Sequence, residues 1–276
     1  MMWLCFLPLA LLVGTPSQAK SPEADRLITL HLEAVVLSDD DGGRSCQISH
    51  AQVQTWIDFS NRVYRAAGIA ILFDPRKDTR RLQSTLLNDM KGDGDLTPER
   101  LQLGNTVAGQ SPGKIAVLFR HGPGQTPTGQ GFSWWTYNFV VMSGYTARVR
   151  CGHHDNSALA HELGHYFGLS HTFAHHPPFE TRKEAERFLK SNMKNPLCFD
   201  GDGLSDTPPD PGIFSMACER QWVVELAGMQ VACPRRNIMS FYDERDRLSP
   251  LQIRRVKEVL GSRLKHRMSP RAEPQK

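Results

Sequence analysis

The chain has 276 residues, of which 39% are hydrophobic and 22% are charged, a composition typical of a globular protein with a substantial core. The net charge is only +4, and basic residues gather after Arg254 in an expected solvated helix and tail. The sequence therefore gives no reason to expect a nucleic-acid partner. We expect one domain with two lobes rather than two independent domains.

Residues 1–19 have the pattern of a secretory signal peptide. Residues 3–13 are apolar, and the small residues Ser17 and Ala19 stand just before a polar sequence. We expect cleavage after Ala19 and a secreted or periplasmic protein. Because no Lys or Arg precedes the apolar run, a short membrane anchor is the alternative interpretation. No other apolar run is long enough to span a bilayer, so no stable membrane association is expected.

The remaining chain contains an odd number of cysteines in a compartment where disulfides form. These are Cys46, Cys151, Cys198, Cys218 and Cys233. The number predicts one or two bridges and a spare thiol.

The N-terminal half shows an order of strand, helix, strand and strand before the histidine-rich motif described below. Residues 27–37 are apolar and β-branched enough for a first strand. Ser49 and Gln52 form a capping box that opens a helix, and Gly68 stops its apolar periodicity. Further strands are expected at residues 69–73 and 114–119.

Residues 75–112 are polar and are expected to form an insertion. Their spacing is similar to that of a calcium-binding EF-hand loop at Asp89, Asp93, Gly94 and Asp95. However, Lys91 and Arg100 stand where that pattern needs oxygen ligands. The sequence favours a solvated turn over a calcium site.

Residues 129–142, GQGFSWWTYNFVVM, predict two short strands. The first would border a substrate-binding cleft in the fold proposed below. An exposed strand edge there can hold an extended peptide by main-chain hydrogen bonds. Trp134 and Trp135 are equally consistent with core or surface packing. Asn156 or Ser157 is expected to cap the helix that follows.

Residues 161–171 read HELGHYFGLSH, and this stretch supplies three metal ligands and a general base. His161 and His165 lie one helical turn apart, so both imidazoles can reach one ion at about 2.0–2.1 Å. Gly168 can take a positive φ, end the helix and return His171 to the metal. An accidental run of solvated histidines is the alternative, but it does not account for Gly168 and His171.

Three nitrogen ligands leave the fourth tetrahedral position for water, which is typical of a catalytic zinc site. Glu162 is placed to accept the proton of that water. The motif therefore predicts metal-assisted hydrolysis.

Two more helices are expected after the motif. Residues 180–194 are highly charged and predict a surface helix. A last helix should begin after Ser249, with Pro250 at its first position and Gln252 completing a capping box.

The C-terminal half resembles the pappalysin family of metzincin zinc endopeptidases. The resemblance is carried by HELGHYFGLSHTF at 161–173, by Cys198 with DGDGLSDTP at 200–208, by Cys233 with NIMSFYD at 237–243, and by LSPLQIRRV at 248–256. It implies an α+β fold of the metzincin type. A twisted mixed sheet and the active-site helix would form an N-terminal lobe, and a smaller irregular C-terminal lobe would hold the Met-turn and the final helix.

The resemblance also implies roles for particular residues. His161, His165 and His171 would bind zinc, Glu162 would be the general acid and base, and Met239 would support the site from below without binding the metal. A calcium ion is implied at Asp200, Asp202, Asp206 and Thr207, whose oxygen ligands suit that cation. A metal-free acidic turn is the alternative.

The sequence departs from the family pattern in two places. The family implies a bridge between Cys198 and Cys233, but its second bridge needs a cysteine that residues 243–248 lack, so Cys218 is left free or pairs with Cys46 or Cys151. Phe241 stands where relatives carry a tyrosine that stabilises the transition state. Tyr242, one residue later, is the candidate substitute; the alternative is that the shift in register removes this contribution.

The sequence thus predicts a secreted zinc-dependent endopeptidase with a protein or peptide substrate. After the signal peptide, residues 20–171 would form the N-terminal lobe, 172–265 the C-terminal lobe and 266–276 a basic tail. An inactive secreted binding protein that keeps the metzincin fold is the alternative. A calcium-stabilised interaction module would leave the histidines unexplained.

Overall fold

The computed structural model describes residues 27–90, 95–121, 131–132, 137–143, 149–151, 153–173 and 178–268. The expected signal peptide, part of the acidic loop (91–94), Trp134, Trp135 and the end of the basic tail lie outside the described residues.

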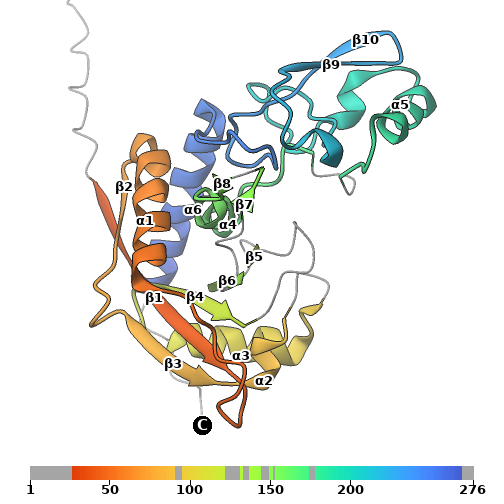
Figure 1. Ribbon diagram of the computed structural model, residues 1–276. Helices are drawn as coiled ribbons and strands as arrows, with labels where there is room; N and C mark the ends of the chain where they lie inside the picture. The colour runs from red at the N-terminus through yellow and green to blue at the C-terminus, as the bar shows by residue number, and fades with distance from the viewer. Residues whose placement is uncertain are drawn as a thin grey trace, which may run out of the picture.

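A mixed sheet forms the base of the larger lobe (Figure 1). Its strands are β1 (Ile28–Ser38), β2 (Ile69–Leu72), β3 (Thr79–Gln83), β4 (Lys114–Arg120), β5 (Gly131–Phe132) and β6 (Phe139–Ser143). Their order is β2-β1-β4-β6-β5, with β3 also pairing with β1. All pairs are parallel except β5 with β6, so the sheet is mixed, as predicted.

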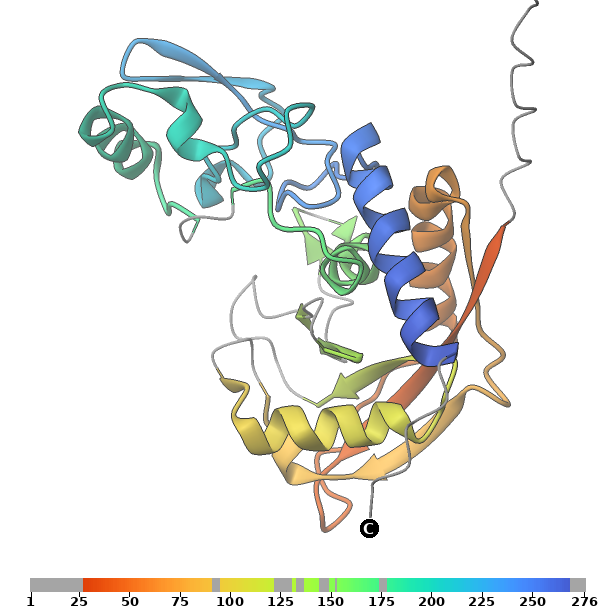
Figure 2. The same cartoon turned by 180° about the vertical axis from the view of Figure 1, so that it is seen from behind.

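Three helices cover one face of the sheet: α1 (His50–Tyr64), α4 (Ala158–Tyr166) and α6 (Pro250–Met268). Figure 2 shows them on the side of the sheet opposite α2 (Thr85–Asn88) and α3 (Pro98–Gly109). Because side chains alternate along a strand, β1 contributes residues to the hydrophobic cores on both faces of the sheet. Ala34 and Val36 join the core under α1 and α4, whereas Val35 and Leu37 pack with Val107 of α3.

The smaller lobe is irregular. It contains α5 (Arg182–Ser191), the 3-10 turns η3 (Pro196–Phe199) and η4 (Phe214–Met216), and a hairpin of β9 (Val223–Leu226) and β10 (Met229–Ala232). Helix α6 follows this lobe in the sequence, yet its Val256 and Leu260 lie in the core of the larger lobe beside α1. The remaining elements are η1 (Arg65–Ala67), β7 (Val149–Arg150) and β8 (His153–His154).

Local signals place the ends of several helices as predicted. Ser49 accepts a hydrogen bond from the Gln52 backbone N–H at 3.1 Å. Gly68 has a φ of 71° and ends the first helical run. At the start of α6, the Ser249 hydroxyl accepts a hydrogen bond from the Gln252 backbone N–H at 3.2 Å. The Gln252 side-chain oxygen in turn accepts from the Ser249 backbone N–H at 3.0 Å, which completes the predicted capping box.

Residues 75–112 contain more structure than the predicted insertion. They form β3, α2 and α3, which cover the second face of the sheet. Asp89, the first acidic residue of the EF-hand-like pattern, accepts a hydrogen bond from the Arg44 side chain at 2.7 Å. That carboxylate thus has a cationic partner from within the chain.

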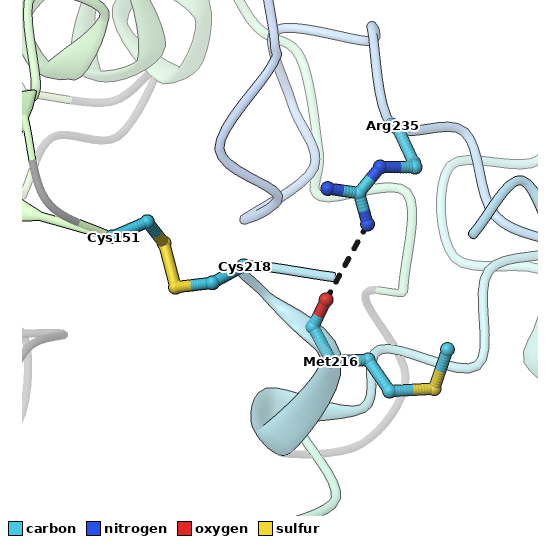
Figure 3. The surroundings of a disulfide bond; sticks show 4 residues. All are labelled: Cys151, Met216, Cys218 and Arg235. Carbon is cyan, nitrogen blue, oxygen red and sulfur yellow. Dashed lines mark hydrogen bonds between the residues drawn. A yellow bond between two sulfur atoms is a disulfide. The ribbon is translucent and has the colours of Figure 1, made fainter. Parts of the chain in front are cut away.

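The disulfide expected between Cys198 and Cys233 is wrong. Cys151 and Cys218 form the bridge instead (Figure 3), while Cys198 and Cys233 are free thiols. Cys233 is buried in the core of the small lobe, where burial raises the pKa of its thiol to about 11 although Tyr242 hydrogen-bonds to it. Cys218 lies just after η4, and its partner Cys151 lies just after β7. Cys151 is one of the two partners for Cys218 that the sequence left open.

Among the helices of the described residues, none combines the length and apolar character needed to cross a bilayer.

Candidate metal centre

Helix α4 carries the first two candidate ligands. All of its residues are buried, and His161 and His165 project from the same face one turn apart. Gly168 has a φ of 86°, and its backbone N–H donates to the His165 carbonyl at 2.9 Å. Leu169 N–H donates to the Gly164 carbonyl at 2.9 Å, which closes the end of the helix. This left-handed turn directs the chain back toward α4 and delivers His171.

The three imidazoles converge through their Nε2 atoms. His171 Nε2 lies 3.1 Å from His161 Nε2 and 2.9 Å from His165 Nε2. Two nitrogen ligands at 2.0–2.1 Å from a tetrahedral ion lie about 3.3 Å apart. The three nitrogens therefore have the spacing of one face of a tetrahedral metal site. Within the described residues, this triad is the group of His, Cys, Asp or Glu side chains that could hold a metal ion.

Backbone carbonyls face the other ring nitrogens. His161 Nδ1 lies 2.7 Å from the Ile238 carbonyl, and His165 Nδ1 lies 2.9 Å from the Leu169 carbonyl. Because a carbonyl only accepts, each Nδ1 carries the proton and each Nε2 presents a lone pair to the centre. This tautomer is the one that binds a metal through Nε2.

The electrostatic environment keeps the triad neutral. Burial lowers the pKa of His165 to about 4. Burial also lowers the pKa values of His161 and His171 well below the usual range, and the positive charge of Arg245 adds to the effect. Neutral imidazoles are the form that ligates a metal, so the triad could bind a cation.

Met239 lies directly beneath α4, where the sequence expects the Met-turn residue. It is fully buried, and a Cβ atom added to Gly164 would overlap its sulfur. Met239 N–H donates to the Asn237 side chain at 2.9 Å, and its carbonyl accepts from Thr172 N–H at 3.3 Å. The Met-turn thus contacts both the helix that carries two histidines and the segment that carries the third.

Glu162 lies on α4 beside His161 and is 8% exposed. It is close enough to Tyr64 that, after burial, its charge further raises the pKa of that phenol. The Tyr64 hydroxyl itself donates to the Ala160 carbonyl at 2.6 Å.

Neither aromatic residue after the Met-turn presents a hydroxyl to the triad. Phe241 packs edge-on against Phe173 at 5.1 Å and has no hydroxyl. Tyr242 is fully buried, and its hydroxyl donates to Asp210 Oδ1 at 2.7 Å. A catalytic role for Tyr242 would require that hydrogen bond to break.

The residues expected to bind calcium have partners within the chain. Asp200 accepts from Gly203 N–H at 3.1 Å, and Asp202 accepts from Leu204 N–H at 3.0 Å. Asp206 accepts from Ser249 Oγ and from Leu251 N–H, both at 2.8 Å, at the start of α6. Thr207 is buried. The three carboxylates do not form a convergent group among the described residues.

Sequence reasoning missed three buried polar residues around the centre. Asp210 accepts from Thr172 Oγ1, next to His171, and from Tyr242. Asp155 and Arg245 form an ion pair behind His161. Their partners are distant in the sequence, so no local pattern reveals them.

The comparisons with known proteins agree with this geometry. Residues 128–261 match the family model described as pregnancy-associated plasma protein-A. A solved structure of mirolysin in complex with compound 9 has 13% sequence identity, covers 88% of this chain and 96% of its own, and gives a TM-score of 0.57. Mature mirolysin of Tannerella forsythia in complex with a cleaved peptide gives 13% identity, 88% and 98% coverage, and a TM-score of 0.55. No curated protein matches the chain.

The family match and the histidine triad together indicate a metalloendopeptidase. The fold is that of mirolysin, which confirms the predicted fold class. The family match includes all three histidines and the Met-turn. The matched part of the chain, residues 128–261, is therefore of the pappalysin type that the sequence motifs predicted.

Proposed function

We propose that the protein is a zinc-dependent endopeptidase that acts outside the cytoplasm on internal peptide bonds. The convergence of three Nε2 atoms beside Glu162 is the observation that carries this proposal. The proposed export rests on the signal-like residues 1–19.

The donor set suits zinc. His161, His165 and His171 would hold the ion as neutral imidazoles, in a tautomer set by backbone carbonyls. When bound, zinc lowers the pKa of a water ligand to about 7 and polarises the scissile carbonyl. Glu162 would accept a proton from the attacking water and pass it to the leaving amine. We leave Tyr242 out of the reaction because its hydroxyl is held by Asp210.

An extended peptide would lie along β5. This strand ends the order of the sheet, pairs with β6 on one side, and contacts α4. Strand addition at such an edge holds a peptide main chain in register with a nearby catalytic centre. The mirolysin complex with a cleaved peptide supports a peptide as the substrate class.

A secreted binding protein without turnover is the second candidate. The observation that favours it is the Phe241 side chain, which offers no hydroxyl where relatives place a tyrosine. Glu162 favours catalysis, because a binding protein needs no carboxylate beside the metal.

Replacing Glu162 tests the proposal. The purified wild type should contain one zinc per chain and cleave a mixed peptide library, and Glu162→Gln should keep the zinc while kcat/KM falls about 10²- to 10⁴-fold. Glu258→Gln, an exposed change on α6, is the control and should leave cleavage unchanged. Zinc without cleavage by the wild type would favour the binding protein, and a wild type that binds no zinc would refute the endopeptidase.

We also propose calcium as a structural ion of the turn at residues 200–207. Burial raises the pKa of Asp202 to about 6, and the nearby charge of Asp200 adds a smaller increase, so a cation at this turn would relieve an unfavourable buried charge. Asp206 is left out of the ligand set, since its carboxylate already holds the start of α6.

A further inference from the structure

A buried ion pair lies behind the first candidate metal ligand. Asp155 and Arg245 are each 6% exposed, and Asp155 Oδ2 accepts from Arg245 Nη2 at 2.9 Å. Removing two charges from water is unfavourable unless their remaining polar atoms are also satisfied. The other partners of this pair therefore indicate what it holds together.

Those partners belong to two separate parts of the metal centre. Arg245 Nε donates to Ser157 Oγ at 2.7 Å, and Arg245 Nη1 donates to the Ser240 carbonyl at 2.9 Å. Ser157 is the N-cap of α4 and also donates to Asp155, through both its backbone N–H and its hydroxyl. Ser240 follows the Met-turn methionine. One guanidinium thus joins the start of the metal-binding helix to the Met-turn.

The pair is anchored to the rest of the larger lobe as well. The Asp155 backbone carbonyl accepts a hydrogen bond from Trp56 Nε1 at 3.1 Å, and Trp56 is fully buried in α1. The planar fork of an arginine can meet several acceptors in fixed directions, which a lysine cannot do. The Asp155 anchor therefore fixes the direction of the Arg245 side chain.

The same guanidinium borders the His161 ring. Arg245 Nη1 lies 3.0 Å from His161 Nδ1, while the Ile238 carbonyl lies 2.7 Å from that same nitrogen. Nδ1 cannot donate to the carbonyl and accept from the guanidinium at once. Metal binding through Nε2 needs the donating form, and Arg245 Nη1 already has an acceptor in Ser240. Arg245 therefore packs beside the His161 ring, and the Ile238 carbonyl keeps the ring proton on Nδ1.

We propose that Arg245, held by Asp155, is a positioning residue of the metal centre. It fixes the Met-turn against the start of α4 and keeps the Nε2 atom of His161 directed toward the other two histidines. This role rests on the proposed function, because it concerns the metal held by the triad.

Metal binding by the apo protein tests the proposal without a substrate. Arg245→Met should weaken zinc affinity about 10- to 100-fold, measured by competition with a chromophoric chelator, because residues that support a ligand have effects of this size. The visible spectrum of the Co²⁺ form should also change, since the ligand field reports the geometry of His161. Arg245→Lys keeps the charge but not the fork, and it should weaken affinity by a smaller factor.

Arg80→Met is the matched control. Arg80 forms an ion pair with Glu33 on the sheet, away from the histidines, with an Nη2 to Oε2 distance of 3.2 Å. It should lower the melting temperature of the apo protein while leaving zinc affinity and the Co²⁺ spectrum unchanged. If Arg245→Met does not fold, Arg245→Lys decides the matter by the same measurements.

The outcomes separate this inference from the proposed function. A wild type that binds no zinc refutes the proposed function. Wild-type affinity and an unaltered Co²⁺ spectrum in a folded Arg245 variant overturn the positioning role alone. An affinity loss equal to that of Arg80→Met would also overturn it, because that loss would report general destabilisation.

Discussion

The contact between Gly164 and Met239 shows how the absence of a side chain at one position shapes the candidate metal centre. Gly164 lies between the two histidines of α4, and Met239 fills the space that a Cβ atom at this position would need. Met239 is fully buried, so it has little freedom to move aside. A thioether is soft and adaptable, which suits a side chain that must pack closely against a helix backbone.

Gly164→Ala should therefore destabilise the protein, although alanine is the better helix former. We expect a loss of about 1–3 kcal/mol in the free energy of unfolding from overpacking, measured by urea denaturation, together with weaker zinc binding. Gly261→Ala in α6 is the control, because a Cβ there meets nothing within 4 Å and should be neutral or stabilising. In Gly164→Ala/Met239→Ala the two losses should be less than additive. Full additivity would show that the two residues are not coupled.

The residues of the triad could be predicted because their geometry is local. The three histidines lie within eleven residues of each other, on a helix and the turn that ends it. Helical spacing brings His161 and His165 together, and the positive φ of Gly168 returns His171 to them. The Asp155–Arg245 pair joins residues 90 positions apart, and only the fold reveals it. The Tyr242 hydroxyl is a similar case, since its partner Asp210 comes from a loop that has no periodic pattern.

At the scale of elements, α6 shows how a C-terminal helix is fixed to the larger lobe. Its start is capped twice, by Ser249 with Gln252 and by the Asp206 carboxylate, which accepts from Ser249 Oγ and from Leu251 N–H. A negative charge at a helix N-terminus is favourable because free N–H groups and the helix dipole meet there. The local capping signal was visible in the sequence, whereas the contribution of Asp206 depends on the fold.

Elements with weak local patterns were the ones that sequence reasoning missed. Strand β3 reads TRRLQ and is only partly buried, so it shows no clear alternation. Helix α3 buries only Gly104, Val107 and Ala108, and its remaining residues are too polar to mark it as part of a core. Both are stabilised by the sheet surface that they cover, and this partner is assembled from distant parts of the chain.

Two variants of the acidic turn should behave differently if calcium binds there. Asp206→Ala should lower the free energy of unfolding by about 1 kcal/mol, as loss of a helix cap does, and keep any calcium response. Asp202→Asn should abolish a calcium-induced rise in melting temperature. In the wild type this rise should be largest above pH 6 and decline at lower pH, because the pKa of Asp202 is raised to about 6 and its protonated form binds calcium poorly. No calcium response in the wild type at any pH would contradict calcium binding at this turn.

At the scale of the whole molecule, the candidate metal centre is assembled across the boundary of the two lobes. Helix α4 lies on the sheet, the Met-turn follows the small lobe, and α6 returns to the large lobe (Figure 1). The disulfide between Cys151 and Cys218 joins residues 67 positions apart, and all three histidines lie between them. The bridge therefore restricts the part of the unfolded chain that carries the three histidines.

Removing that bridge should destabilise the folded protein, and with it the candidate metal centre, because the unfolded chain gains conformational entropy. Cross-linking a loop of this length stabilises a fold by about 2–4 kcal/mol, so Cys151→Ser/Cys218→Ser should lose a comparable amount in urea denaturation of the apo protein. Added zinc should restore part of the loss, because a ligand that binds only the folded state contributes about 2.7 kcal/mol at a hundredfold excess over its Kd. Cys198→Ser, which alters a free and partly exposed thiol, should have little effect. Two results would show that the pairing in Figure 3 is wrong: peptide mapping that links Cys198 to Cys233, or a Cys198→Ser variant as unstable as the double variant. The bridge that constrains the chain would then be the one implied by the family.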